Sequence, residues 1–115
     1  MSKIFKEYAK NKQVEIDKKD TDYEIVMKCL MKEYGFIAPI FKDTDTAEII
    51  ELDMDYQNFA LHKRYLETVE PIEPVEPEII GIVVKTGNRY RLIDGHHRFK
   101  WASKYREKAS FILIC

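Results

Sequence analysis

The segment Asp94–Arg98, with the sequence Asp-Gly-His-His-Arg, carries the residue types best suited to chemistry in this chain. The residues before it, Tyr90–Ile93, predict a strand, and residues 96–106 predict a helix. A strand that breaks at a glycine and opens directly into a helix aims the first free N–H groups of the helix at one point, where the helix dipole adds partial positive charge. Because Gly95 has no side chain, the backbone can approach a ligand closely. The pattern therefore predicts a site for an anion, most simply a phosphate.

The three side chains that follow the glycine strengthen this prediction. His96, His97 and Arg98 fall in the first helical turn, where the dipole repels cations unless an anion lies between them. Arg98 can give phosphate oxygens two parallel hydrogen bonds, and the histidines can donate hydrogen bonds or move protons. For Asp94 three roles stay open: it can orient a histidine, cap the helix, or help to hold a metal ion bound to the phosphates. The alternative is that Asp94 and the histidines only cap the helix and face solvent.

Residues 90–102, Tyr-Arg-Leu-Ile-Asp-Gly-His-His-Arg-Phe-Lys-Trp-Ala, resemble the signature of the ParB/sulfiredoxin superfamily. In that family a hairpin strand leads into a D-G-H-H-R or G-x-R-R motif, with a small residue four positions after the arginine, as Ala102 follows Arg98 here. The family binds nucleotide phosphates at this turn: CTP in chromosome-partition proteins, ATP in sulfiredoxin, and ADP or ATP in related serine kinases. The resemblance implies binding of a nucleotide such as ATP, ADP or CTP, together with Mg²⁺, by Asp94, Gly95, His96, His97 and Arg98.

A second, weaker match is Lys32–Ile40, which is similar to the helix–G-[LF]-x-x-P-[IL] element that precedes the hairpin in this family and lines its nucleotide site. It adds Gly35 and Pro39 to the residues expected at the nucleotide. Here a long stretch separates this element from the hairpin. Either the loop carries a large insertion, or residues 77–80 are the true equivalent and residues 1–50 are an added element.

Two departures narrow the function that the resemblance implies. Sulfiredoxin uses a cysteine directly before its His-Arg pair, whereas this chain has His96 there, and Cys29 and Cys115 lie elsewhere. Partition proteins carry a downstream helix-turn-helix domain for DNA, which we do not expect within these 115 residues. The related serine kinases are also longer than this chain. We therefore expect a minimal nucleotide-binding core, and nucleotide hydrolysis or phosphotransfer stays open. In a catalytic reading, Arg98 would stabilise phosphoryl charge and His96 or His97 would act as acid or base.

Two other classes of function stay open. The first is a DNA-associated partition, plasmid or phage module, or a ParB-like nuclease. A run of basic residues could then follow a nucleic-acid backbone, although a solvated helix face is the commoner reason for such a run: Lys100, Lys104, Arg106 and Lys108. The second is a non-catalytic interaction domain, and a homodimer is compatible with either class. No metal site is expected, because the spacing of the histidines is not that of known zinc sites: His62, His96 and His97.

Composition bounds the class of protein. A chain of 115 residues with 45% apolar and 34% charged residues suits one folded domain rather than a disordered chain. It has no apolar run of the roughly 20 residues that span a membrane and no signal-peptide pattern at its start, so we expect a cytoplasmic protein without a membrane partner. Acidic side chains predominate in residues 43–80 and basic ones in residues 81–115, which suits an anionic ligand at the basic end.

The hydrophobic pattern predicts an α+β fold in one domain over residues 1–115, which the resemblance refines to a small ParB/sulfiredoxin-like mixed sheet with flanking helices. The close resemblance covers residues 77–114, and residues 1–76 are helical and extended additions. Phe36–Phe41 predicts a short extended segment. Glu70–Pro77, with a proline at every third position, predicts a stiff polyproline-like connector, with an exposed recognition strip as the alternative. We expect helices over 22–34, 55–69 and 96–106, and strands over 47–54, 79–84, 90–93 and 111–114.

Overall fold

The computed structural model describes residues 3–115, and the chain divides into two compact units, residues up to Ala47 and residues 48–115. The first unit contains helices α1 (Lys3–Asn11) and α2 (Asp22–Tyr34), which pack on each other. The second unit contains the sheet and the helices that follow it. The expectation of a single domain over residues 1–115 stays a prediction. None of the helices formed by residues 3–115 has both the length and the apolar character that crossing a bilayer requires.

Helix α2 begins and ends where the sequence predicts. Thr21 lies at the N-cap, where its hydroxyl accepts from the amide of Glu24 at 3.1 Å, and the Glu24 carboxylate accepts from the amide of Thr21 at 3.0 Å. This reciprocal capping box satisfies two amides that a helix start leaves unpaired. At the other end Gly35 adopts φ 77° and donates its N–H to the carbonyl four residues back, the left-handed termination that glycine favours. The Lys28 ammonium, 2.6 Å from the Asp20 carboxylate, ties the helix to the loop before it.

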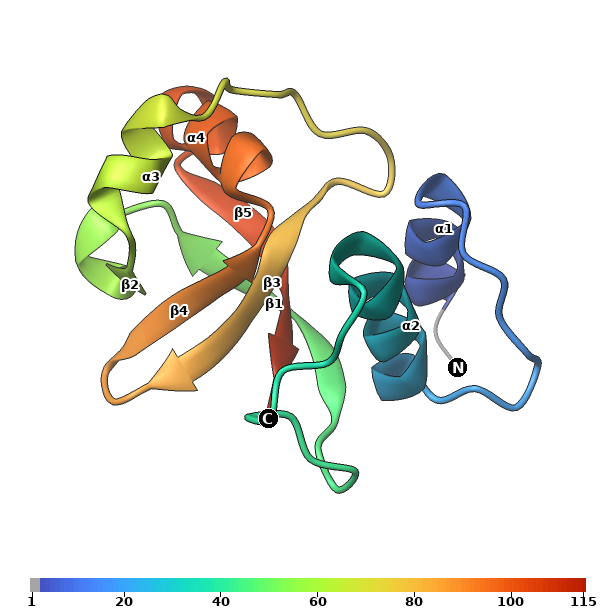
Figure 1. Cartoon of the computed structure of the whole chain (residues 1–115). Helices are drawn as coiled ribbons and strands as arrows, with labels where there is room; N and C mark the ends of the chain where they lie inside the picture. The colour runs from blue at the N-terminus through green and yellow to red at the C-terminus, as the bar shows by residue number, and fades with distance from the viewer. Residues whose placement is uncertain (1–2) are drawn as a thin grey trace. The chain divides into compact units, whose positions relative to one another are not determined.

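A five-stranded mixed sheet organises the second unit, with the strand order β1-β5-β3-β4-β2 (Figure 1). Strands β3 and β4 form an antiparallel hairpin, β5 runs parallel to β3, and β2 runs parallel to β4. The predicted fold class, α+β with a small mixed sheet and flanking helices, is confirmed. The strands are β1 (Ala47–Asp53), β2 (Phe59–Ala60), β3 (Ile79–Thr86), β4 (Arg89–Asp94) and β5 (Lys108–Ile114).

Two helices cover the sheet, α3 (Lys63–Thr68) and α4 (His96–Tyr105), and they lie side by side in Figure 1. Phe99 anchors α4, because its fully buried ring meets the ring of Phe59 at 4.8 Å and that of Phe111 at 6.3 Å between centroids. Such edge-on and tilted aromatic contacts add about 0.5–1.5 kcal/mol per pair to the free energy of burial. One hydrophobic cluster of this unit comprises Phe59, Leu66, Val69, Ile80, Val83, Leu92, Phe99, Ala102, Phe111 and Leu113.

The single helix predicted over residues 55–69 is wrong. The segment instead forms a 3₁₀ turn, η1 (Tyr56–Asn58), then strand β2, then the short helix α3. Phe59 stands three residues before His62 and seven before Leu66, which is a helical spacing, but it lies in β2 and is buried. Helix α3 then starts at Lys63, with His62 as its N-cap: the Nδ1 of His62 accepts from the amide of Tyr65 at 3.1 Å. Burial of one aromatic ring therefore overrode the local pattern, as tertiary packing often does.

The loop after α2 also differs from its prediction. Phe36–Phe41 contains a turn rather than a fully extended segment, because the amide of Phe41 donates to the carbonyl of Ala38 at 3.1 Å. Pro39 occupies the second position of this turn, where a fixed φ near −65° is favoured. The turn therefore gives Pro39 a structural role of its own.

Two glycines allow the end of β4 and the start of α4 to pack directly on β3. Gly95 adopts φ 96° and ψ 26°, and a Cβ there would lie 2.2 Å from the carbonyl oxygen of Ile80. A Cβ on Gly81 would lie 2.1 Å from the carbonyl oxygen of Asp94. Neither position has room for a side chain without a shift of the backbone. This contact fixes the direction in which α4 leaves the sheet.

Replacement of Gly95 by alanine tests this constraint. Gly95→Ala adds a left-handed strain of about 1–2 kcal/mol and an overpacking cost of about 1–3 kcal/mol. The matched control is Gly87→Ala in the β3–β4 turn, where φ is 61° and no atom lies within 4 Å of the added Cβ. Denaturant unfolding should show Gly95→Ala to be the less stable by about 1–3 kcal/mol, the steric difference. An equal loss of unfolding free energy in the two variants would contradict the close backbone contact at Gly95.

Candidate anion site at the start of helix α4

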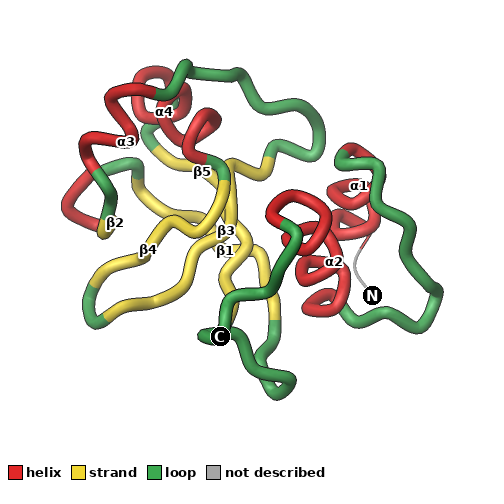
Figure 2. The backbone as a smooth tube through the Cα atoms, viewed as in Figure 1, coloured by secondary structure: helices red, strands yellow, loops and turns green. Residues whose placement is uncertain are grey.

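The β4–α4 junction has the backbone geometry that the sequence predicts. Strand β4 ends at Asp94, Gly95 is the N-cap residue, and α4 begins at once (Figure 2). The first intrahelical bond runs from the amide of Phe99 to the carbonyl of Gly95 at 2.8 Å. The amides of residues 96–98 precede that bond and have no acceptor within the helix, and Gly95 offers no side-chain cap. Three N–H groups at the positive end of the helix dipole therefore lie together in the first turn of α4, where His96 and Arg98 are half-buried and His97 is exposed.

Arg98 adds a cation to this turn. Its side chain is half-buried, and within residues 3–115 it makes no hydrogen bond or ion pair. Arg106 gives the contrast, because its guanidinium donates to the Glu78 carboxylate at 2.9 and 3.1 Å. A guanidinium on the first turn of a helix, with no carboxylate paired to it, is free to bind an anion through its paired N–H groups.

His96 is held mainly in its neutral form. Its half-buried ring meets the ring of Tyr65 edge-on, with 5.0 Å between centroids. Burial lowers the pKa of His96, the nearby His97 and His62 lower it further, and the charge of Asp94 opposes the shift. A neutral imidazole can donate one hydrogen bond and accept another. His96 therefore suits proton transfer better than charge neutralisation.

His97 has a structural role that the sequence did not reveal. Its ring Nδ1 lies 2.9 Å from the carbonyl oxygen of Glu70, and its own carbonyl accepts from the amide of Ile72 at 3.1 Å. One helical turn further on, Lys100 donates to the carbonyls of Glu67 at 3.1 Å and Val69 at 2.8 Å. These two α4 residues therefore hold the end of α3 and the start of the connector. Their spacing of three places both on one face of the helix, but the carbonyls that they contact are distant in sequence.

The other predicted site residues are placed as follows. Asp94 is buried and immediately precedes the N-cap residue Gly95, so the Asp94 carboxylate does not occupy the N-cap position itself. Gly35 and Pro39 belong to the first unit, where Gly35 ends α2 and Pro39 forms a turn. Their expected part in nucleotide binding stays a prediction. In the part of the chain that the structure describes, no group of three or more His, Cys, Asp or Glu side chains is arranged to hold a metal ion.

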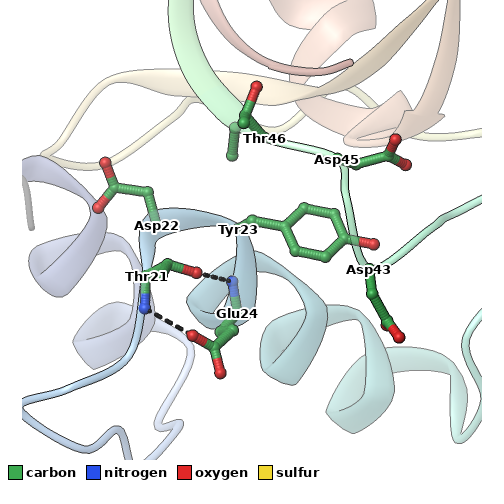
Figure 3. A pocket seen from close by; sticks show the side chains of 8 residues that line it. Thr21, Asp22, Tyr23, Glu24, Asp43, Asp45 and Thr46 are labelled. Atoms are coloured by element: carbon green, nitrogen blue, oxygen red, sulfur yellow. Dashed lines mark hydrogen bonds between the residues drawn. The ribbon is translucent and has the colours of Figure 1, made fainter.

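A cavity of about 520 Å³ within the first unit was not anticipated (Figure 3). The ring of Tyr23 points toward Asp43 and Asp45 across this cavity. Burial raises the pKa of the Tyr23 hydroxyl, and the charges of Asp45 and Asp43 raise it further. Asp22 and Glu24 add two more carboxylates to the lining. A lining of this charge disfavours phosphate, so the cavity is no rival to the β4–α4 junction as an anion site.

A second cavity, of about 450 Å³, lies beside α3 and α4 in the second unit. The surface that lines it is mainly apolar. The lining residues are Tyr56, Lys63, Leu66, Glu67 and Lys100. Tyr56 crosses this region, since its hydroxyl donates to Ser103 at 3.2 Å and its ring meets that of Phe99 at 6.0 Å. Sequence spacing could not indicate this cavity, because η1 and α3 were predicted as one helix.

Comparison with known proteins yields no match to a protein-family model, a curated protein or a solved structure. The resemblance to the ParB/sulfiredoxin superfamily therefore stays a prediction carried by the sequence motif.

The lowered pKa of His96 predicts a pH-dependent stability. The ordinary histidine pKa is 6.5, so the unfolded chain binds a proton there more tightly than the folded chain. The stabilisation is fully present above pH 6.5 and is lost as the pH falls toward the lower folded pKa. The unfolding free energy of the wild type should fall between pH 7.5 and pH 5, and should fall less in His96→Gln. Identical pH profiles in denaturant titrations of the two proteins would contradict this account of His96.

Proposed function

We propose that this chain binds the phosphate groups of a nucleotide at the β4–α4 junction. The observation that carries the proposal is the half-buried Arg98, which has no hydrogen-bond or ion-pair partner among residues 3–115, on a helical turn whose first amides have no acceptor in the helix. Backbone amides at a helix start and an arginine fork are complementary to phosphate oxygens. The D-G-H-H-R motif, which resembles that of the ParB/sulfiredoxin superfamily, extends the proposal from phosphate to ATP, ADP or CTP.

In any hydrolysis or phosphotransfer, His96 would be the main residue to transfer protons. This histidine is neutral near pH 7, since its pKa lies below the ordinary value, and can act as a general base. His97 is less suited to that role, because its Nδ1 is already within 2.9 Å of the Glu70 carbonyl. Arg98 would stabilise the charge that develops on the phosphoryl group. Mg²⁺ would enter with the nucleotide, since it is usually held by phosphates and one or two carboxylates; Asp94 is the carboxylate next to the junction.

The DNA-associated alternative has weaker support from the contacts of the basic run. Lys100 donates to carbonyls at the end of α3, Arg106 pairs with Glu78, and Lys108 lies 4.0 Å from the Asp53 carboxylate. Cations that already have carbonyl or carboxylate partners contribute less to phosphate-backbone binding. Three of the four basic side chains of the run already have such partners, which favours a small phosphate-bearing ligand over a nucleic acid. A homodimer and a non-catalytic interaction domain remain compatible with the fold.

Thermal unfolding with and without ligands tests the proposal. ATP, ADP, CTP, GTP and inorganic phosphate would each be added, with and without Mg²⁺, to the wild type, to Arg98→Ala and to Arg91→Ala. Arg91 is an exposed arginine on β4 and controls for loss of charge. A ligand at 100 times its dissociation constant should stabilise the wild type and Arg91→Ala by about 2.7 kcal/mol, with little effect on Arg98→Ala.

The pattern of shifts distinguishes the alternatives. Base-selective stabilisation that is lost in Arg98→Ala would support a nucleotide site, and equal shifts with all ligands would reduce it to a phosphate site. An absence of any shift in folded wild-type protein would contradict the proposal and leave the interaction-domain reading. Salt-sensitive DNA binding that is unaffected by nucleotides would instead favour the DNA-associated reading.

A further inference from the structure

The proline strip, residues 70–75 with the sequence Glu-Pro-Ile-Glu-Pro-Val, is a regular feature that nucleotide binding does not use. It joins α3 to β3 and contains no helix or strand (Figure 1). Proline fixes φ near −65° and restricts the residue before it to extended conformations. Val69, which leads into the strip, has φ −80° and ψ 147°, close to ideal polyproline II values. Backbone chemistry therefore favours a polyproline II helix along the strip.

A polyproline II helix has three residues per turn, so the repeat of three sorts the strip into rows. Glu70 and Glu73 fall in one row, the two prolines in a second, and Ile72 and Val75 in a third. The aliphatic row faces solvent, because Ile72 is 51% exposed and Val75 is 68% exposed. Both glutamates are exposed as well. The strip thus presents an apolar row and an acidic row side by side.

Helix α4 holds the strip at its start. The ring of His97 lies 2.9 Å from the Glu70 carbonyl, the amide of Ile72 donates to the His97 carbonyl, and Lys100 donates to the Val69 carbonyl. A segment that is already extended and fixed loses little conformational entropy when it binds a partner. This anchoring distinguishes the strip from a flexible linker, in which the exposed rows would have no defined arrangement.

We propose that the proline strip is a docking site for a protein domain that recognises polyproline II segments. Such domains present grooves lined by aromatic side chains that accept proline and aliphatic residues in turn. The pairs Pro71–Ile72 and Pro74–Val75 supply these residues at a repeat of three. The charge of the partner follows from the acidic row: Glu70 and Glu73 require lysine or arginine beside the groove. The partner is therefore a domain with an aromatic groove and a basic margin.

Binding measurements on the full-length chain test this docking site. The probes are purified SH3, WW and EVH1 domains, some with basic and some with acidic residues beside the groove, titrated by calorimetry. Domains with a basic margin should bind with micromolar dissociation constants, more weakly at higher salt. Val75→Ser should weaken binding about tenfold or more, which is about 1.4 kcal/mol. Its side chain is largely exposed, so this variant should keep the fold.

A matched pair of charge reversals separates the acidic row from net charge. Glu73→Lys should abolish binding to the basic domains, whereas Glu33→Lys, the same change at an exposed residue of α2, should leave it unchanged. Pro71→Ala with Pro74→Ala should weaken binding in protein that circular dichroism shows to be folded. The docking site would be refuted by an absence of binding at about millimolar domain concentration. Equal loss in Glu33→Lys, or wild-type affinity in Val75→Ser, would refute it as well.

Discussion

The close contact between two backbones at Gly81 and Gly95 is the constraint on which the second unit depends. A side chain at either position would collide with a carbonyl oxygen of the facing strand or turn, at 2.1 or 2.2 Å. With both side chains absent, β4 can end against β3 and α4 can start without a connecting loop. The direction of α4 then carries Phe99 into the aromatic core, and the first amides of the helix have no acceptor within it. The contact between Gly81 and Gly95 thus underlies both the packing of α4 and the geometry of the candidate anion site.

Elements governed by local chemistry could be predicted from the sequence. The capping box of Thr21 and Glu24 and the stop at Gly35 define α2, and the turn at Gly87 defines the β3–β4 hairpin. The pattern failed over residues 55–69, where three short elements replace one helix. Phe59 decides the outcome there, because its ring is buried against Phe99, a residue far along the chain. Spacing within a window of sequence holds no information about such a partner.

In the candidate site, too, features set by local sequence could be predicted, whereas features set by tertiary contacts could not. The free amides, the left-handed Gly95 and the cation at Arg98 follow from a strand–glycine–helix pattern and could be anticipated. The neutral character of His96 could not, because it comes from burial and from charges brought together by folding. The hydrogen bond of His97 to the proline strip could not be anticipated either. It gives a structural role to a residue that the sequence predicts to bind phosphate. Sequence motifs identify the place of a site more readily than the task of each side chain in it.

The most direct test of the account is a nuclear magnetic resonance titration of the ¹⁵N-labelled chain with ATP and with inorganic phosphate. It follows the backbone amides of residues 96–98 and the guanidinium Nε–H of Arg98. The account predicts saturable shifts of these resonances in the wild type, since hydrogen bonding to phosphate changes the environment of each N–H. It also predicts loss of the backbone shifts in Arg98→Ala. Unchanged resonances at the junction of a folded protein, with or without shifts elsewhere, would contradict an anion site at the start of α4.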